Sequence, residues 1–93
     1  MYVIRETFVA KPGMASKLAT MFKSISGSTP WKPRVMTDAV GPFNTVILET
    51  EVKELGEFDR MMKEYGERAD IREKMKGYTD MYVSGGREIY KVL

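Results

Sequence analysis

The stretch VAKPGMASKL, Val9–Leu18, joins a strand-like segment to a helix-like segment. Upstream, Tyr2–Ala10 is rich in β-branched and aromatic residues, which favours a strand. Downstream, apolar residues recur three and four positions apart, at Met14, Leu18, Met21, Phe22 and Ile25, which predicts an amphipathic helix. Pro12 suits the first turn of that helix, and Gly13 allows a tight turn out of the strand. The join therefore predicts a structural corner rather than a phosphate-binding loop, which would need a different glycine pattern.

The middle of the chain predicts a loop followed by a β-hairpin. Ser26–Pro33 reads as the loop, because it is rich in serine, glycine and proline. Two strand-like segments follow, Arg34–Val40 and Asn44–Val52. The Gly-Pro-Phe sequence at 41–43 separates them and supplies the turn signal.

The last forty or so residues predict further helix and a closing strand. Two apolar stripes have helical spacing, the first at Leu55, Phe58, Met62 and Tyr65 and the second at Ile71, Met75 and Tyr78, with Tyr82 as a candidate fourth member. Gly66 is the expected break between them. The Ser-Gly-Gly segment at 84–86 is expected to end the helical region, and Arg87–Leu93 to form the strand.

The resulting element order, β-α-β-β-α-(α)-β, predicts an α+β fold of the ferredoxin-like kind, with a four-stranded antiparallel sheet in a single domain, residues 1–93. The helices of such a fold cover one face of the sheet. The other face must meet solvent, a ligand or a second copy of the chain, and the apolar residues on both faces of the first strand favour the last two. The apolar count in the third strand would put Val46 and Leu48 toward the helices.

Composition excludes several classes of function. The chain has 15 basic and 13 acidic residues, interleaved to a net charge of +2, so no concentrated positive field points to nucleic acid. It has neither cysteine nor histidine, which excludes disulfides, thiolate nucleophiles, and zinc or haem sites that need those ligands. No apolar segment is long enough to cross a bilayer. We therefore expect a cytoplasmic protein with no metal, no cofactor and no membrane partner.

Three segments carry a resemblance to a known family: TFVAKPG, GPFNTVILETEVKEL and REIYKV. Together they resemble the dimeric α/β-barrel superfamily, most closely its NIPSNAP branch and the domains similar to antibiotic biosynthesis monooxygenases. The resemblance implies a homodimer whose two sheets form a barrel that can hold a small molecule. The resemblance also implies that the side chains of Val46 and Leu48 point into the barrel lumen. This conflicts with the apolar count, so the choice of face stays open.

The chain departs from the NIPSNAP pattern at three positions. Such chains tend to carry His and Trp in the strand after the Gly-Pro turn, where Leu48 and Thr50 stand here, and often an Arg in strand one, where Glu6 stands. These departures argue against a haem role that depends on a histidine ligand.

Glu6 is the candidate catalytic residue. It interrupts an otherwise apolar strand face formed by Tyr2, Ile4 and Phe8, where a carboxylate is costly to bury without a partner. In a closed barrel it would be a candidate general base. The plainer interpretation is a salt bridge to an arginine on another strand, such as Arg34 or Arg87.

Four residues are candidates for ligand binding: Phe8, Trp31, Asn44 and Tyr90. Trp31 could cover the mouth of the barrel, or it could fill the edge of the dimer. Asn44 could orient a polar ligand, although asparagine near a turn commonly bonds its own backbone.

Three functional hypotheses remain open. The first is a homodimer that binds a small apolar or aromatic ligand without catalysis. The second is a cofactor-independent monooxygenase, in which a base such as Glu6 forms the anion of a phenolic substrate and the anion reacts with dioxygen. The third, an RNA-binding module of the same element order, ranks last because the strands lack the required pattern of basic and aromatic residues.

Overall fold

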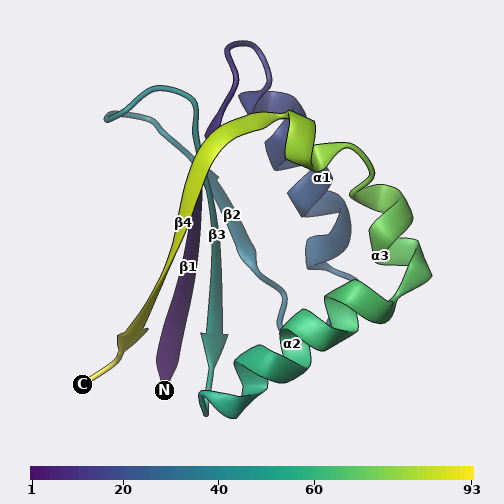
Figure 1. Ribbon diagram of the computed structural model, residues 1–93. Coiled ribbons are helices and arrows are strands. Elements are labelled where there is room, and N and C mark those ends of the chain that lie inside the picture. Colours follow the sequence, from purple (N-terminus) through teal and green to yellow (C-terminus); the bar gives the residue numbers. More distant parts are fainter.

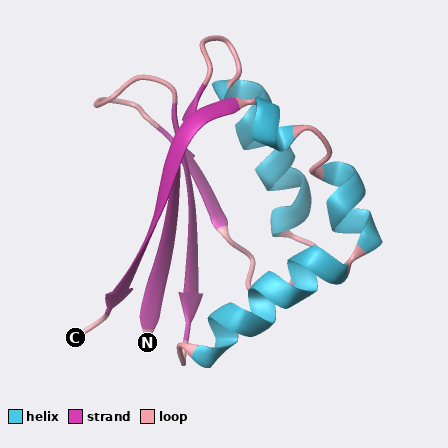
Figure 2. Ribbon diagram, in the orientation of Figure 1, coloured by secondary structure: helices cyan, strands magenta, loops and turns pink.

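A computed structural model describes residues 1–93 as one antiparallel sheet with helices on one face (Figures 1 and 2). In chain order the elements are β1 (Tyr2–Ala10), α1 (Ala15–Ser26), β2 (Arg34–Thr37), β3 (Thr45–Val52), α2 (Gly56–Glu67), α3 (Ala69–Lys74), the 3₁₀ turn η1 (Tyr78–Asp80) and β4 (Tyr82–Lys91). The four strands lie in the order β2-β3-β1-β4, and every neighbouring pair is antiparallel. The predicted ferredoxin-like fold and element order are confirmed.

The corner at Lys11–Met14 is a tight turn. The Met14 N–H donates to the Lys11 carbonyl at 2.9 Å, and Gly13 has a φ of +81°. Proline at the second position and a positive φ at the third are the signature of a type II turn. The structural corner is thus confirmed, but the prediction that Pro12 lies in the first helical turn is wrong, since α1 begins at Ala15.

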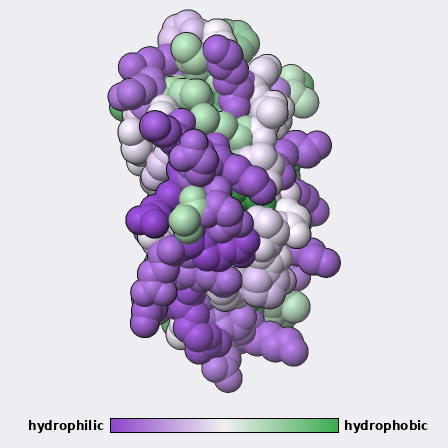
Figure 3. All heavy atoms as spheres, turned by 90° about the vertical axis from the view of Figure 1, so that its right-hand side faces the viewer, coloured by the Kyte–Doolittle hydropathy of each residue, from purple (hydrophilic) through white to green (hydrophobic).

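The helices form a single layer against the sheet, and their outer surface is largely hydrophilic (Figure 3). The opposite face of the sheet has no helix over it (Figure 1). No helix is long and apolar enough to cross a bilayer.

The buried core lies between the two layers in two parts. One part gathers under α1 and consists of Ala10, Leu18, Phe22 and Val46. The other lies toward the opposite end of the sheet, under α2, and consists of Ile4, Val52 and Met61. Since apolar burial is the main stabilising term, the two parts fix how the helices sit on the sheet.

Strand register settles which face of the sheet meets the helices. Glu6 pairs with Leu48 on one side and with Arg87 on the other, and Phe8 pairs with Val46. Val46 is fully buried in the core, so the side chains on its face of the sheet, including Glu6, Phe8 and Leu48, point toward the helices. The apolar count therefore predicted the orientation correctly, and the lumen-facing orientation implied by the family pattern is wrong.

Two strand boundaries differ from the sequence prediction by three residues or more. β2 ends at Thr37 rather than Val40, because the Asp38 carboxylate accepts the Thr45 N–H at 2.9 Å and closes a loop there. β4 begins at Tyr82, so the Ser-Gly-Gly segment lies inside the strand and does not stop a helix.

The junction between α2 and α3 also differs. The helix continues through Gly66, and the break falls at Arg68, whose backbone is extended with a ψ of 116°. The Arg68 guanidinium donates to the Ser28 carbonyl at 2.6 Å and also pairs with Asp70. Arg68 thus contacts the segment that follows α1 and the first turn of α3, and these contacts fix the position of the break. Tyr78 lies on η1, beyond the end of α3.

Candidate functional site

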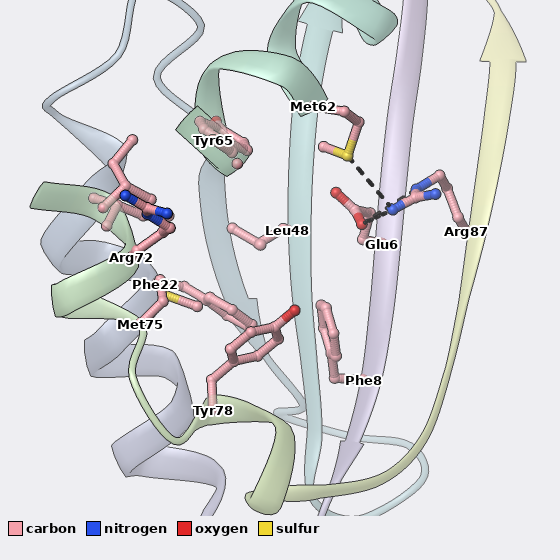
Figure 4. A pocket seen from close by; sticks show the side chains of 13 residues that line it. Glu6, Phe8, Phe22, Leu48, Met62, Tyr65, Arg72, Met75, Tyr78 and Arg87 are labelled. Atoms are coloured by element: carbon pink, nitrogen blue, oxygen red, sulfur yellow. Dashed lines mark hydrogen bonds and ion pairs between the residues drawn. The ribbon is translucent and has the colours of Figure 1, made fainter. Parts of the chain in front are cut away.

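An open pocket of about 370 Å³ lies between the sheet and the helices, between the two parts of the core (Figure 4). Hydrophobic residues make up 9 of the 13 that line it. Phe8 and Leu48 project from the sheet, and Met62, Met75 and Tyr78 from the helix layer. A concave, mainly apolar site with a few polar groups is the usual form of a small-molecule site.

An ion pair between Glu6 and Arg87 borders the sheet side of the pocket. Arg87 donates to one carboxylate oxygen, Oε2, at 3.2 Å from Nε and 2.7 Å from Nη2. The Arg87 guanidinium also lies 4.9 Å from the centre of the Phe58 ring and contacts the Met62 sulfur. The expected salt bridge is therefore present with Arg87, whereas Arg34 pairs with Glu49.

The second oxygen of Glu6, Oε1, accepts no hydrogen bond from the protein and points away from Arg87 toward the pocket (Figure 4). The Glu6 side chain is only 16% exposed. A partly desolvated acceptor with a vacant oxygen favours a ligand that carries an O–H or N–H group.

Two tyrosine hydroxyls add neutral polar groups. Burial, followed by the neighbouring Tyr82 and Glu6, raises the pKa of Tyr78, and burial likewise raises the pKa of Tyr65. Both hydroxyls therefore keep their protons at neutral pH. The Tyr78 hydroxyl points into the pocket (Figure 4), and the Tyr65 hydroxyl is buried without a hydrogen-bond partner. The pocket thus offers one carboxylate acceptor and the neutral Tyr78 hydroxyl within an aromatic and aliphatic surround.

The structure brings two of the five sequence-predicted site residues together, Glu6 and Phe8. Phe8 packs against Phe22 with ring centres 4.9 Å apart and forms part of the pocket wall. Glu6 is on the helix side of the sheet, so it faces this pocket and not the uncovered face.

The other three predicted residues lie outside the pocket lining. Trp31 packs edge-on against Tyr65, with ring centres 6.2 Å apart, behind the pocket wall. Asn44 ends the β2–β3 loop with a φ of +64°, and its carbonyl accepts the Ala10 N–H at 2.8 Å. Tyr90 lies on the uncovered face of the sheet beside Arg5. Their roles in ligand binding stay predictions.

Several pocket residues were not singled out in the sequence. Tyr65, Met75 and Tyr78 appeared there only as members of helical apolar stripes, and Arg72 only among the interleaved basic and acidic residues. The one available signal was the tyrosine hydroxyl near the end of each stripe, since a tyrosine in a core position usually seeks a polar partner.

The uncovered face carries a separate charged cluster. The Glu49 carboxylate accepts hydrogen bonds from Arg5 at 2.8 and 3.0 Å and from Arg34 at 2.8 Å. The hydrogen bond from Arg5, reinforced by Arg34, lowers the pKa of Glu49 below its ordinary value of 4.5. Around this cluster lie half-buried apolar residues of three strands: Val3, Val9, Met36 and Ile47.

No protein-family model matches the sequence, and no curated sequence matches it significantly. Solved structures do match. A NIPSNAP family protein from Agrobacterium tumefaciens has a TM-score of 0.84 at 12% identity, over 97% of this chain and 90% of that one.

Two further structures agree with it. An uncharacterised NIPSNAP-like domain protein from Burkholderia xenovorans has a TM-score of 0.84 at 15% identity, over 99% of this chain and 84% of that one. A candidate antibiotic biosynthesis monooxygenase from Nitrosomonas europaea has a TM-score of 0.70 at 20% identity, over 100% and 99% of the two chains. The chain therefore has the ferredoxin-like fold that NIPSNAP proteins and proteins similar to antibiotic biosynthesis monooxygenases share.

Proposed function

We propose that this protein binds a small, largely apolar or aromatic molecule in the pocket between the sheet and the helices. The vacant Glu6 Oε1, set in an apolar pocket beside the neutral Tyr78 hydroxyl, is the observation that carries the proposal. Apolar contact would supply most of the affinity, and a donor group on the ligand would fix its orientation by bonding Glu6. A cytoplasmic location stays a prediction from the sequence.

A binding titration tests this function. The probe is N-phenyl-1-naphthylamine, a neutral aromatic amine whose fluorescence rises in apolar surroundings. Wild-type protein is expected to bind it saturably. Met75→Trp should abolish most of the binding because the larger side chain fills the pocket. Met21→Trp is the matched control, since Met21 does not line this pocket. Saturable binding that both variants retain would contradict the proposal.

The proposal includes a homodimer joined through the uncovered faces of the two sheets. Support comes from the half-buried apolar residues Val3, Met36 and Ile47, which an entirely solvated sheet face would not favour. Arg5, Arg34 and Glu49 are already paired there within the chain, so a second copy could cover this cluster without leaving a lone charge. Glu51 and Glu88 of the same face form no ion pair within the chain, so the contact must leave them in solvent or give them partners. The family resemblance predicts the same contact.

A second candidate function is a cofactor-independent monooxygenase, favoured by the vacant oxygen of Glu6 and by the structural likeness to a candidate monooxygenase. Glu6 would take a proton from a phenolic substrate held among the aromatic residues. The substrate anion would then react with dioxygen, with one oxygen atom entering the product and the other leaving in water.

Dioxygen consumption with anthrone, a tricyclic phenol tautomer, tests this activity. Wild-type protein should consume dioxygen faster than the uncatalysed reaction, and Glu6→Gln should reduce the rate to that background. Equal rates above the uncatalysed reaction in both proteins would reject Glu6 as the base. Rates no faster than the uncatalysed reaction in both would leave binding as the function.

A further inference from the structure

Arg72 is a cation at the pocket without an acidic partner. The chain has six arginines. Four of them form ion pairs, namely Arg5, Arg34, Arg68 and Arg87. Arg60 and Arg72 form none, and of these two only Arg72 lines the pocket.

The charges at the pocket do not balance. Its charged lining residues are Glu6, Arg72 and Arg87, which gives two positive charges and one negative charge. Arg87 compensates Glu6 through their ion pair. Two acids lie near Arg72 on α3: Glu73, the next residue, forms no ion pair with it, and Asp70 is already paired with Arg68. The charge of Arg72 is therefore left for solvent or a ligand.

The polar groups stand on opposite walls. Figure 4 places Arg72 on the helix side, across the pocket from Glu6 and Arg87 on the sheet. Apolar side chains, including Leu48 and Phe22, lie between the two walls. A bound molecule would thus meet an acceptor at one end, apolar surface along its length and a guanidinium at the other end.

We propose that the ligand is a small organic acid, with an apolar body, a carboxylate or similar anionic group at Arg72, and a hydroxyl or amine at Glu6. The inference rests on the proposed function of the pocket and adds the charge and orientation of its ligand. Guanidinium matches a carboxylate in geometry and forms charge-assisted hydrogen bonds with it. The Glu6 carboxylate would repel the anionic group from its own wall, so the ligand enters in one orientation.

Two probes with the same aromatic skeleton test the inference. N-phenyl-1-naphthylamine is neutral, and 5-anilinonaphthalene-1-sulfonate carries an additional sulfonate on the opposite side of the ring system from the amine. Arg72→Met should weaken binding of the sulfonate about three- to tenfold, a range set by partial solvent screening, and change binding of the neutral probe less than about twofold. Arg72→Lys should restore part of the loss. Added salt should weaken the binding of the sulfonate probe and leave the binding of the neutral probe unchanged.

Arg60→Met is the matched control, because Arg60 is also exposed and free of ion pairs but does not line the pocket. It should leave the affinity of both probes unchanged. Equal effects of Arg72→Met on the two probes, or no effect on either, would overturn the organic-acid ligand and leave the pocket as a binding site. Failure of wild-type protein to bind the neutral probe would overturn the proposed function, and this inference with it.

Discussion

Arg87 holds Glu6 through a single carboxylate oxygen, with both guanidinium nitrogens bonded to Oε2 at 3.2 and 2.7 Å, and leaves Oε1 vacant on the pocket side. The pair joins adjacent strands, since Glu6 lies on β1 opposite Arg87 on β4. The ion pair therefore does two things: it compensates a partly buried carboxylate, and it directs an acceptor toward the pocket.

The acceptor role of Glu6 predicts the outcome of two substitutions. Glu6→Gln has a single oxygen, which Arg87 engages at the Oε2 position, so an NH2 donor replaces the vacant acceptor and the affinity for N-phenyl-1-naphthylamine should fall about three- to tenfold. Glu6→Leu removes the acceptor, and the affinity should fall about tenfold. Fluorescence titration measures both. Undiminished binding by Glu6→Leu would show that the vacant oxygen does not contact the probe.

Two neighbouring glycines on β4 should respond differently to alanine. A Cβ at Gly85 would lie 2.9 Å from the Thr7 carbonyl oxygen and 3.7 Å from the Phe8 ring, whereas a Cβ at Gly86 meets nothing within 4 Å. Gly85→Ala should lower the free energy of unfolding by about 1–3 kcal/mol because the strands must move apart. Gly86→Ala should change it by less than about 1 kcal/mol.

Urea unfolding followed by circular dichroism gives both values. Equal destabilisation by the two substitutions would mean that the close approach of β1 and β4 at Gly85 is not a constraint on the fold.

The Glu49 cluster predicts a loss of stability in acid. Its hydrogen bonds to Arg5 and Arg34 hold the pKa of Glu49 below 4.5 in the folded protein. A lowered folded-state pKa stabilises the fold above the unfolded pKa, and this contribution disappears as pH falls through the folded value. The unfolding temperature of Glu49→Gln should therefore lie below that of wild type at pH 7, and the difference should shrink below about pH 4.5. A difference that stays constant across this range would contradict the role of the carboxylate.

The dimer proposal predicts that the uncovered face is sensitive to charge. Ile47 lies there between Thr7 of β1 and Met36 of β2. Ile47→Lys should give a folded monomer, because two copies would bury an unpaired ammonium group at their contact. Leu55→Lys is the control, since Leu55 is 50% exposed at the start of α2 and away from that face. Sedimentation velocity reports the mass.

Wild type and Leu55→Lys should sediment as dimers at micromolar concentration. A wild-type monomer at every accessible concentration would contradict the dimer proposal. It would not affect the pocket, which one chain forms alone.

Local sequence patterns predicted the element order well, because strand and helix periodicities are visible within a few residues. The errors have long-range causes. Ser84–Gly86 has the composition of a loop, yet it forms strand because it pairs with β1. A glycine is needed at position 85 because the Thr7 carbonyl leaves no room for a side chain there. The helix break falls at Arg68 rather than Gly66, where Arg68 bonds Ser28, forty positions away.

The candidate site was only partly predictable for the same reason. Glu6 was found because a carboxylate interrupts an apolar pattern, which is a local signal. Tyr78 and Arg72 fit their local patterns, as a helical apolar position and a solvated charge. Only the packing of α2 and α3 over the sheet brings them to one pocket with Glu6. Tertiary structure alone supplies that information.

The most direct test of the central claim, a ligand site between the sheet and the helices, uses methyl NMR of the methionines. Met62 and Met75 line the pocket, whereas Met36 lies on the uncovered face and Met21 on the far side of α1. On titration with N-phenyl-1-naphthylamine, we predict large shifts for Met62 and Met75 and unchanged signals for Met36 and Met21. Shifts at Met36 with none at Met62 and Met75 would place the ligand on the uncovered face and contradict the account.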